Sequence, residues 1–325
     1  MRSVCLAILV FLGRKGPDGA SLHMKIFTSP FKNPYINLAL EDYFLRHSDD
    51  LPMIFFYVNR PCVVYGRFQN PWLESDLHTL NQYDIWPVRR QSGGGSVFHD
   101  EGNLNFCYIV PRSRIDKTEF SLLMIQALAR ADIKLSLSQR NDLWISDHDG
   151  HLKKISGSAY KQTKSSSFHH GTFLVSSDLA LLERCLKSTL HSSSSVSIPS
   201  VRSQVASLQQ FFPRMEIPDV IELVEEHLKE THQFEGIHKI NETFIQKKHV
   251  LENFHALRDW SWLWGETPMF EIESLQGLIK VKKGIVLNHS KTFELASMKN
   301  YFSDEDLLKM FPDFSEQSTS SSQIF

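Results

Sequence analysis

Residues 89–100 read RRQSGGGSVFHD and place three consecutive glycines, Gly93 to Gly95, beside two arginines. Glycine loses more backbone freedom on folding than any other residue, so such a run is costly in a regular element. Main chain without Cβ atoms lets a ligand approach closely and turns N–H groups towards its oxygens, while Arg89 and Arg90 supply positive charge. The strand-like residues on both sides favour a ligand-binding loop over a floppy charged surface loop. Neither GxxxxGK[ST] nor GxGxxG is present, so the two common nucleotide-binding loops are not indicated.

A second stretch that could do chemistry is KKISGSAYK, residues 153–161. A lysine beside small residues suits a contact with phosphate or carboxylate, because the ammonium is a compact charge and the small residues leave the main chain accessible. Taken alone the pattern is weak, since most lysines beside a turn are solvated. It gains weight from the nearby NDLW at 141–144 and SSFHHGTF at 166–173.

The adjacent His169 and His170 have the residue type for half of a metal site. Zinc sites need three or four ligands at set spacing, and the sequence has no CxxC or HExxH partner for the pair. We therefore expect ligand contact or a buried, hydrogen-bonded imidazole for these two residues. A Ser-His-Asp hydrolase is not supported, because no GxSxG motif occurs.

The composition is that of a soluble globular protein, with 42% apolar and 22% charged residues in a chain of 325. A formal net charge of -2 gives no global attraction to nucleic acid or to an anionic membrane, so an anionic ligand must be met by a local cluster. The cysteines at 5, 62, 107 and 185 have no CxxC spacing. Their scarcity favours a reducing compartment.

The N-terminal stretch MRSVCLAILVFLGRKG combines basic residues with an apolar run that is too short to span a bilayer. Basic residues without acidic ones favour a mitochondrial presequence over a secretory signal. The alternative is translation from Met24, which would leave the protein in the cytoplasm. In either case residues 1–23 are expected to lie outside the fold.

Hydrophobic periodicity predicts a helix over 33–47, with Asn33 as its cap and Pro34 at the first position. Two β-rich runs separated by Asn59-Arg60-Pro61 predict a hairpin over 53–67. Further helices are expected over 70–83, 120–133, 178–188 and 218–232, and strands over 103–111, 133–138, 141–146, 154–162 and 171–177. The Ser-rich stretch 191–203 is expected to be a loop.

Taken together and in this order, RRQSGGGSVFHDEGNLNF, NDLW, KKISGSAYK and FHHGTFLVSSDL resemble the lipoate-protein ligase A family and its mitochondrial relatives, the lipoyltransferases. NPYINLALEDY, GRFQNPWLESDL and RDWSWLWGETPMF are similar to the same family, so the likeness runs from about residue 25 to 270. It implies an α+β fold with a mixed sheet flanked by helices, like that of biotin ligases and class II synthetases. The implied division is a catalytic domain at 24–250, a small reduced α+β accessory domain at 251–313 and a disordered tail at 314–325.

The resemblance also implies a two-step reaction. Lipoate and ATP with Mg²⁺ give lipoyl-AMP, and a lysine of an acceptor protein then takes the lipoyl group. The implied acceptors are the lipoyl domains of 2-oxoacid dehydrogenase E2 subunits and the glycine-cleavage H protein; no nucleic acid partner and no membrane span are expected.

Position by position, the resemblance assigns Lys154 as the central catalytic residue. The residues it implies for lipoate are Arg90, Ser92, Gly93, Gly94, Gly95 and His170. Those it implies for ATP or AMP are Val97, Phe98, His99, Asn103, Asn141, Asp142, Lys154, Ser158 and Ala159, with Asp142 also at the Mg²⁺–phosphate region.

Three other readings remain open. The region after Phe270 is shorter than the accessory domain of the family's ligases, so a transferase that uses preformed lipoyl-AMP or a lipoylated donor protein is one alternative. An octanoyltransferase would need a thiolate near the lysine stretch, whereas Cys62, Cys107 and Cys185 fall in expected buried strands and a helix. A non-catalytic lipoate-binding protein is the third.

Overall fold

The computed structural model describes residues 23–288 except 49–50, 189, 191 and 275–276. Its centre is a six-stranded mixed sheet in the order β10-β11-β6-β2-β1-β13. Strand β1, next to the edge strand β13, is parallel to both of its neighbours, and the other pairs are antiparallel. The strands are β1 (His23–Thr28), β2 (Met53–Tyr57), β6 (Asn103–Pro111), β10 (Ser156–Gln162), β11 (Ser166–Leu174) and β13 (Gln233–Lys239).

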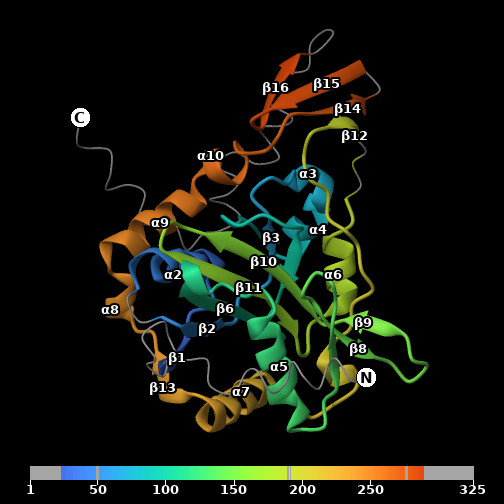
Figure 1. The fold of residues 1–325 in the computed structure, drawn as a ribbon. Coiled ribbons are helices and arrows are strands. Elements are labelled where there is room, and N and C mark those ends of the chain that lie inside the picture. The colour runs from blue at the N-terminus through green and yellow to red at the C-terminus, as the bar shows by residue number, and fades with distance from the viewer. Residues whose placement is uncertain (1–22, 49–50, 189, 191, 275–276, 289–325) are drawn as a thin grey trace.

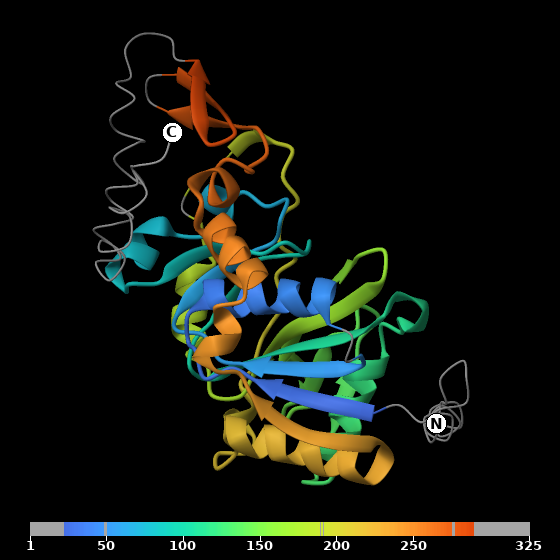
Figure 2. The ribbon, with the colours of Figure 1, turned by 90° about the vertical axis from the view of Figure 1, so that its left-hand side faces the viewer.

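Two helices cover each face of this sheet, as Figures 1 and 2 show. On one face α5 (Glu119–Ala129) and α7 (Ile217–Thr231) bury their apolar sides against β1, β2 and β6. On the other face α2 (Pro34–His47) and α9 (Lys248–Arg258) form a second core. The predicted start of α2 is confirmed, because the Asn33 side chain accepts from the N–H groups of Tyr35 and Ile36.

Smaller sheets flank the main one. The strands β3 (Cys62–Tyr65), β4 (Trp86–Arg89) and β5 (Val97–His99) form a sheet in the order β4-β3-β5. Another sheet contains β7 (Leu135–Leu137), β8 (Leu143–Ser146) and β9 (Leu152–Lys154). The short helices α3 (Pro71–Glu74), α4 (Leu77–Gln82) and α6 (Leu179–Cys185) pack nearby, with 3₁₀ turns at Arg112–Arg114 and Leu208–Gln210.

Near the C-terminal end of the described chain, a four-stranded sheet has the order β12-β14-β15-β16. Its strands are β12 (Ser192–Ser195), β14 (Phe270–Ser274), β15 (Gly277–Lys282) and β16 (Ile285–Asn288). The helices α8 (Glu242–Ile245), α9 and α10 (Trp260–Leu263) lead to it. The predicted loop over 191–203 is therefore wrong for β12, which pairs with the distant β14.

The predicted hairpin over 53–67 is wrong. Strand β2 lies between β1 and β6 in the main sheet, whereas β3 lies in the small sheet beside β4 and β5. The turn residues between them carry the chain from one sheet to the other. Asn59 is fixed there, because its buried side chain bonds both Asn37 and His99. The helix expected over 70–83 is also divided, since Asp76 caps a second helix, α4.

The expected domain division stays a prediction. Residue 250 itself lies inside α9, and Val250 and Leu257 share a core with α2. The predicted tail at 314–325 lies outside the described residues, as does the predicted non-folded extension except for His23, where β1 begins. The α+β class with a mixed sheet flanked by helices is confirmed.

Candidate active site

Arg90 organises the glycine loop. Its Nη2 donates to the carbonyls of Gly93 and Gly95 at 2.7 and 2.8 Å, and its Nη1 donates to Val64 at 3.0 Å. Gly94 has a φ of +93°, which L residues rarely adopt, and a Cβ there would lie 2.9 Å from Arg90 Nη2. The loop is thus a closed turn wrapped around a buried guanidinium, whose burial lowers its pKa to about 10.

Arg89 does not contribute charge to this loop, contrary to the expectation from sequence. Its side chain points away and is fully buried. It donates to the carbonyls of Gly66, Arg67, Gln69 and Leu263 and to the Thr267 hydroxyl. Arg89 therefore binds the segment before the C-terminal sheet to β4. Strand alternation explains why two neighbouring arginines have opposite roles.

Lys154 ends β9 and pairs with Asp142, with 2.9 Å between Nζ and Oδ2. Its backbone is held by a second segment, because its N–H donates to Gln204 and its carbonyl accepts from Ala206. Asp142 is brought opposite by Asn141, whose φ of +64° turns the chain into β8. The carboxylate is buried, whereas the ammonium stays about one-fifth exposed.

The glycine loop and the stretch that contains Lys154 meet at one cavity. A cavity of about 330 Å³ lies between the main sheet and the β4-β3-β5 sheet, and the glycine loop and Lys154 both line it. The expected site residues that line it are Arg90, Gly94, Gly95, Val97, His99, Asp142, Lys154, Ser158, Ala159 and His170. The convergence expected from sequence is therefore present in the fold.

Five other expected residues lie outside this lining. Gly93 turns its carbonyl to Arg90, and Ser92 lies behind the wall, bonded to Arg90 and His170. Asn103 is buried and donates to Asn105, so its amide nitrogen is already satisfied. The Asn141 carbonyl accepts from Ser121 and Ser158. Phe98 borders the second cavity, described below.

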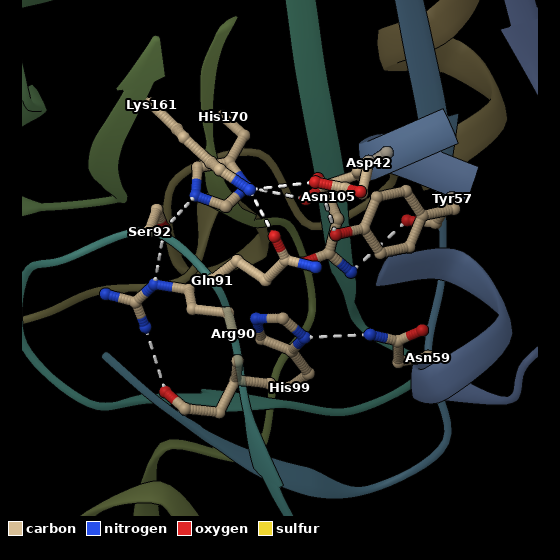
Figure 3. A network of polar contacts seen from close by, with 12 residues as sticks. Asp42, Tyr57, Asn59, Arg90, Gln91, Ser92, His99, Asn105, Lys161 and His170 are labelled. Atoms are coloured by element: carbon tan, nitrogen blue, oxygen red, sulfur yellow. Dashed lines mark hydrogen bonds and ion pairs between the residues drawn. The ribbon is translucent and has the colours of Figure 1, made fainter. Parts of the chain in front are cut away.

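Figure 3 shows the polar network behind the inner end of the cavity. His170 lies there beside Ser92, which in turn contacts Arg90. His99, on β5, bonds Asn59 at 3.0 Å. Burial lowers the pKa of His99 to about 3, with a smaller contribution from Arg90, so this imidazole is neutral at physiological pH.

Sequence reasoning missed several lining residues. Leu38 and Tyr57 come from α2 and β2, elements that were read only as core, and Arg140 directly precedes the NDLW motif. Arg140 is exposed at the cavity, and no ion pair to it occurs among the described residues. Its position next to Asn141 and Asp142 is the signal that could have identified it. The other missed lining residues are Val64, Ser96, Asn105, Gly171, Thr172 and 198–201, whereas Gly157 belongs to the small residues expected to leave the main chain accessible to a ligand.

Residues 196–205, the crossing segment, pass over the cavity after leaving β12. Ser200 Oγ accepts from the N–H of Ser96, and the Ile198 N–H donates to the carbonyl of Phe68. On its other side lies a second cavity of about 660 Å³. The two cavities share wall residues, among them Val97, Lys154 and Gly157, so Lys154 lies where they adjoin.

No cysteine among the described residues lines either cavity. Cys62, Cys107 and Cys185 are fully buried, and burial raises the pKa of each thiol, that of Cys185 to about 12. A thiolate nucleophile is therefore not available beside Lys154 in the part of the chain that the structure describes. The thioester route of an octanoyltransferase has no support from this geometry.

The one candidate cluster of metal ligands within the described ranges lies elsewhere. Asp147, Asp149 and His151 occupy the exposed β8–β9 turn and do not line the cavity. Asp142 is not part of that cluster. In addition, none of the helices that the structure describes has the length and apolar character needed to cross a membrane.

The mixed sheet flanked by helices, and the cavity on which the glycine loop and Lys154 converge, define an α+β domain with a candidate active site. The family described as "Lipoyl protein ligase A/B catalytic domain" matches residues 33–229, which is more than half of the chain. The lipoate-protein ligase A of Psychrobacter cryohalolentis is 36% identical over 257 residues, covering 77% of this chain and 74% of the relative. The chain belongs to the lipoate-protein ligase family.

Solved structures agree on the fold. An ATP-bound lipoate-protein ligase A is 26% identical with a TM-score of 0.56, and the match covers 72% of this chain and 94% of that one. A bipartite lipoate protein ligase from Thermoplasma acidophilum, described with its E2 lipoyl domain, is 24% identical with a TM-score of 0.62, covering 75% and 96%. The fold class expected from the sequence is confirmed.

Proposed function

We propose that this chain attaches lipoate to a lysine of acceptor proteins in two steps through lipoyl-AMP. The observation that carries the proposal is the convergence of the glycine loop and Lys154 on one cavity. Membership of the lipoate-protein ligase family supports the same activity.

In this proposal the acyl chain and the reacting phosphate occupy the first cavity, which Arg140, Asp142 and Lys154 line, and the rest of the nucleotide extends into the adjoining one past Lys154. In the first step a lipoate oxygen bonds to the α-phosphorus of ATP, and the bond to pyrophosphate breaks. In the second step the acceptor amine bonds to the lipoyl carbonyl carbon, AMP leaves and the amine proton passes to solvent. Both steps build negative charge on oxygens, and a fixed ammonium in a partly buried site stabilises that charge.

The residues that would hold Mg²⁺ with the phosphates include Asp142. It is the single carboxylate among the described lining residues of the first cavity. Mg²⁺ in nucleotide sites is commonly bound by one or two carboxylates together with phosphate oxygens, so the donor set fits. The ion would supply charge neutralisation at the phosphates. Lys154 holds the Asp142 carboxylate in place at 2.9 Å.

The acceptors we propose are lipoyl domains of 2-oxoacid dehydrogenase E2 subunits and the glycine-cleavage H protein. The Thermoplasma relative, whose description pairs it with an E2 lipoyl domain, supports the first of these. A folded acceptor would approach the exposed side of the cavity, at Arg140 and Val201.

The test separates the two steps. Purified protein is incubated with lipoate, ATP, Mg²⁺ and an apo lipoyl domain, and pyrophosphate release and acceptor mass are followed independently. We expect both products. If the acceptor gains mass only when lipoyl-AMP or a lipoylated donor protein is supplied, the result would favour the pure transferase. If neither pyrophosphate nor lipoylated acceptor forms under any of these conditions, the result would favour a binding protein.

We also propose that the protein acts in mitochondria, on the basis of the basic, apolar N-terminal sequence. Fusing residues 1–23 to a fluorescent protein should direct it to mitochondria. Cytosolic fluorescence from that fusion would instead favour a start at Met24.

A further inference from the structure

Glu41 is a buried carboxylate in the NPYINLALEDY stretch, to which the sequence assigned no role in the site. It lies on α2 with 2% of its surface exposed. Tyr57 Oη donates to its Oε1 at 2.9 Å, and His170 Nδ1 lies 2.8 Å from its Oε2. Glu41 also lies close enough to the Cys107 thiol to contribute to raising the pKa of that thiol. An acidic side chain that is buried and meets several donors at once is costly unless each bond is made, so Glu41 is fixed in place.

The chain of bonds continues from Glu41 to the glycine loop. His170 Nε2 lies 2.7 Å from Ser92 Oγ, and Ser92 Oγ accepts from Arg90 Nε at 3.0 Å. Arg90 holds Gly93 and Gly95, as described above. Three segments that are far apart in sequence, α2, β11 and the glycine loop, are thus joined behind the inner end of the acyl cavity, and Figure 3 shows the part of this chain from His170 through Ser92 to Arg90.

The charges at the two ends set the direction of the bonds that Arg90 and Glu41 make. A guanidinium can only donate, so Ser92 Oγ accepts from Arg90 Nε and its own hydroxyl proton is available to His170 Nε2, 2.7 Å away. A carboxylate can only accept, so His170 Nδ1 carries the proton that Glu41 receives. Arg90 and Glu41 thus stand at the two ends of the chain, with Ser92 and the His170 ring between them.

We propose that Glu41 is a positioning residue for acyl binding: it fixes the Nδ1–H tautomer and the ring orientation of His170, which lines the cavity, and through Ser92 it steadies Arg90. The inference rests on the proposed function and deepens it, because it assigns a determinant of acyl affinity. His170 then presents its ring edge, rather than a free N–H donor, to the apolar chain of the substrate. Glu41 itself does not touch the substrate.

The decisive variant is Glu41→Gln, which keeps the shape but offers one acceptor oxygen to several donors. We expect the affinity for lipoate, measured by calorimetry, to fall about tenfold, the size expected for one hydrogen bond to a charged group. ATP affinity should change less than about twofold, because Glu41 lies at the acyl end. Glu41→Asp keeps the charge and should recover part of the lost affinity.

A spectroscopic measurement separates positioning from general destabilisation. Long-range ¹H–¹⁵N correlations of ¹⁵N-histidine-labelled protein, assigned with His170→Gln, should report the Nδ1–H tautomer in the wild type and its loss in Glu41→Gln. Asp42→Asn is the matched control: Asp42 follows Glu41 on α2 but bonds Lys161 and Arg46, so this variant should leave the tautomer of His170 unchanged.

A wild-type His170 in the Nε2–H or protonated form, or unchanged lipoate affinity in folded Glu41→Gln, would overturn the proposal. Both readouts are made without turnover. Failure of the proposed ligase reaction would appear separately, as wild-type protein that binds lipoate but forms no product.

Discussion

The two ends of the acyl cavity satisfy their charges in different ways. At the inner end Arg90, Ser92 and His170 are bonded to one another inside the protein. At the outer end Lys154 has a single ion-pair partner, Asp142, and Arg140 has none among the described residues. The inner end is therefore organised before any ligand arrives, whereas the outer end keeps cationic groups available. Such a division suits a substrate with an apolar tail and a reacting carboxylate.

Removing the outer ammonium should have the largest effect. Lys154→Ala is expected to lower the rate of both steps by roughly 10²- to 10³-fold, the usual loss for one group that stabilises developing negative charge. Single-turnover formation of lipoyl-AMP and transfer from supplied lipoyl-AMP measure the steps separately. Lys164→Ala, an exposed lysine in the β10–β11 turn, is the control and should behave like the wild type. Normal transfer from Lys154→Ala would reject the outer end as the reaction centre.

At the inner end, substitution by alanine should have different effects on lipoate affinity at two neighbouring glycines, Gly93 and Gly94. Gly94→Ala forces an L residue to a φ of +93° and places its Cβ 2.9 Å from Arg90 Nη2, so we expect strain of about 1–2 kcal/mol and a loss of lipoate affinity on the order of tenfold. Gly93→Ala meets no atom within 4 Å and has no positive φ, so it should be nearly silent. Calorimetric titration with lipoate checks both. Equal losses would show that the loop is not shaped by Arg90.

The fold was predictable where a local signal is decisive. Asn33-Pro34 begins α2 as expected, because a cap and a pre-set φ act within one turn. Strand pairing was not predictable in the same way. The sequence of residues 53–67 is typical of a hairpin. In the structure, however, Asn59 forms hydrogen bonds with Asn37 and His99, and the two strands belong to different sheets. Likewise, nothing in the serines of β12 indicates Phe270 as a partner.

The candidate active site was likewise predictable only in part from the sequence. The glycine run containing Gly94 was recognised from its residue type, whereas Lys154 was assigned its role through the stretches that accompany it and the family resemblance they carry; both residues line the cavity. Arg89 and Arg90 have the same residue type, and their roles differ only because of the strand geometry. The Arg90 side chain lines the cavity, whereas the Arg89 side chain donates to the carbonyls of Gly66 and Leu263. The role of Glu41 could not be predicted from its place in an apolar helix pattern, because a buried carboxylate can be recognised only from the donors that surround it.

Arg140 offers a smaller test of the outer end. Arg140 lines the same cavity as the paired Lys154 and Asp142 and is exposed, so its guanidinium can meet phosphate oxygens there. Arg140→Gln should lower kcat/KM for ATP about tenfold, as expected for one hydrogen bond to a charged group, and leave lipoate affinity unchanged. Arg140→Lys should recover part of the loss. A fall in lipoate affinity instead would place this residue's influence at the inner end.

The last prediction concerns stability rather than turnover. Burial lowers the pKa of both His99 and His169 from 6.5 to about 3, so the unfolded chain binds protons more readily than the native one. Stability is then complete above pH 6.5 and falls as the pH drops from there towards 3, by about 1 kcal/mol per pH unit for each histidine.

Thermal melts between pH 7.5 and 4.5 measure this slope, and His169→Gln should make it shallower. The substitution keeps a partner for Ser158, which bonds His169 Nε2 at 2.9 Å, but removes the group that titrates. An unaltered slope would mean that His169 is solvated in the native protein.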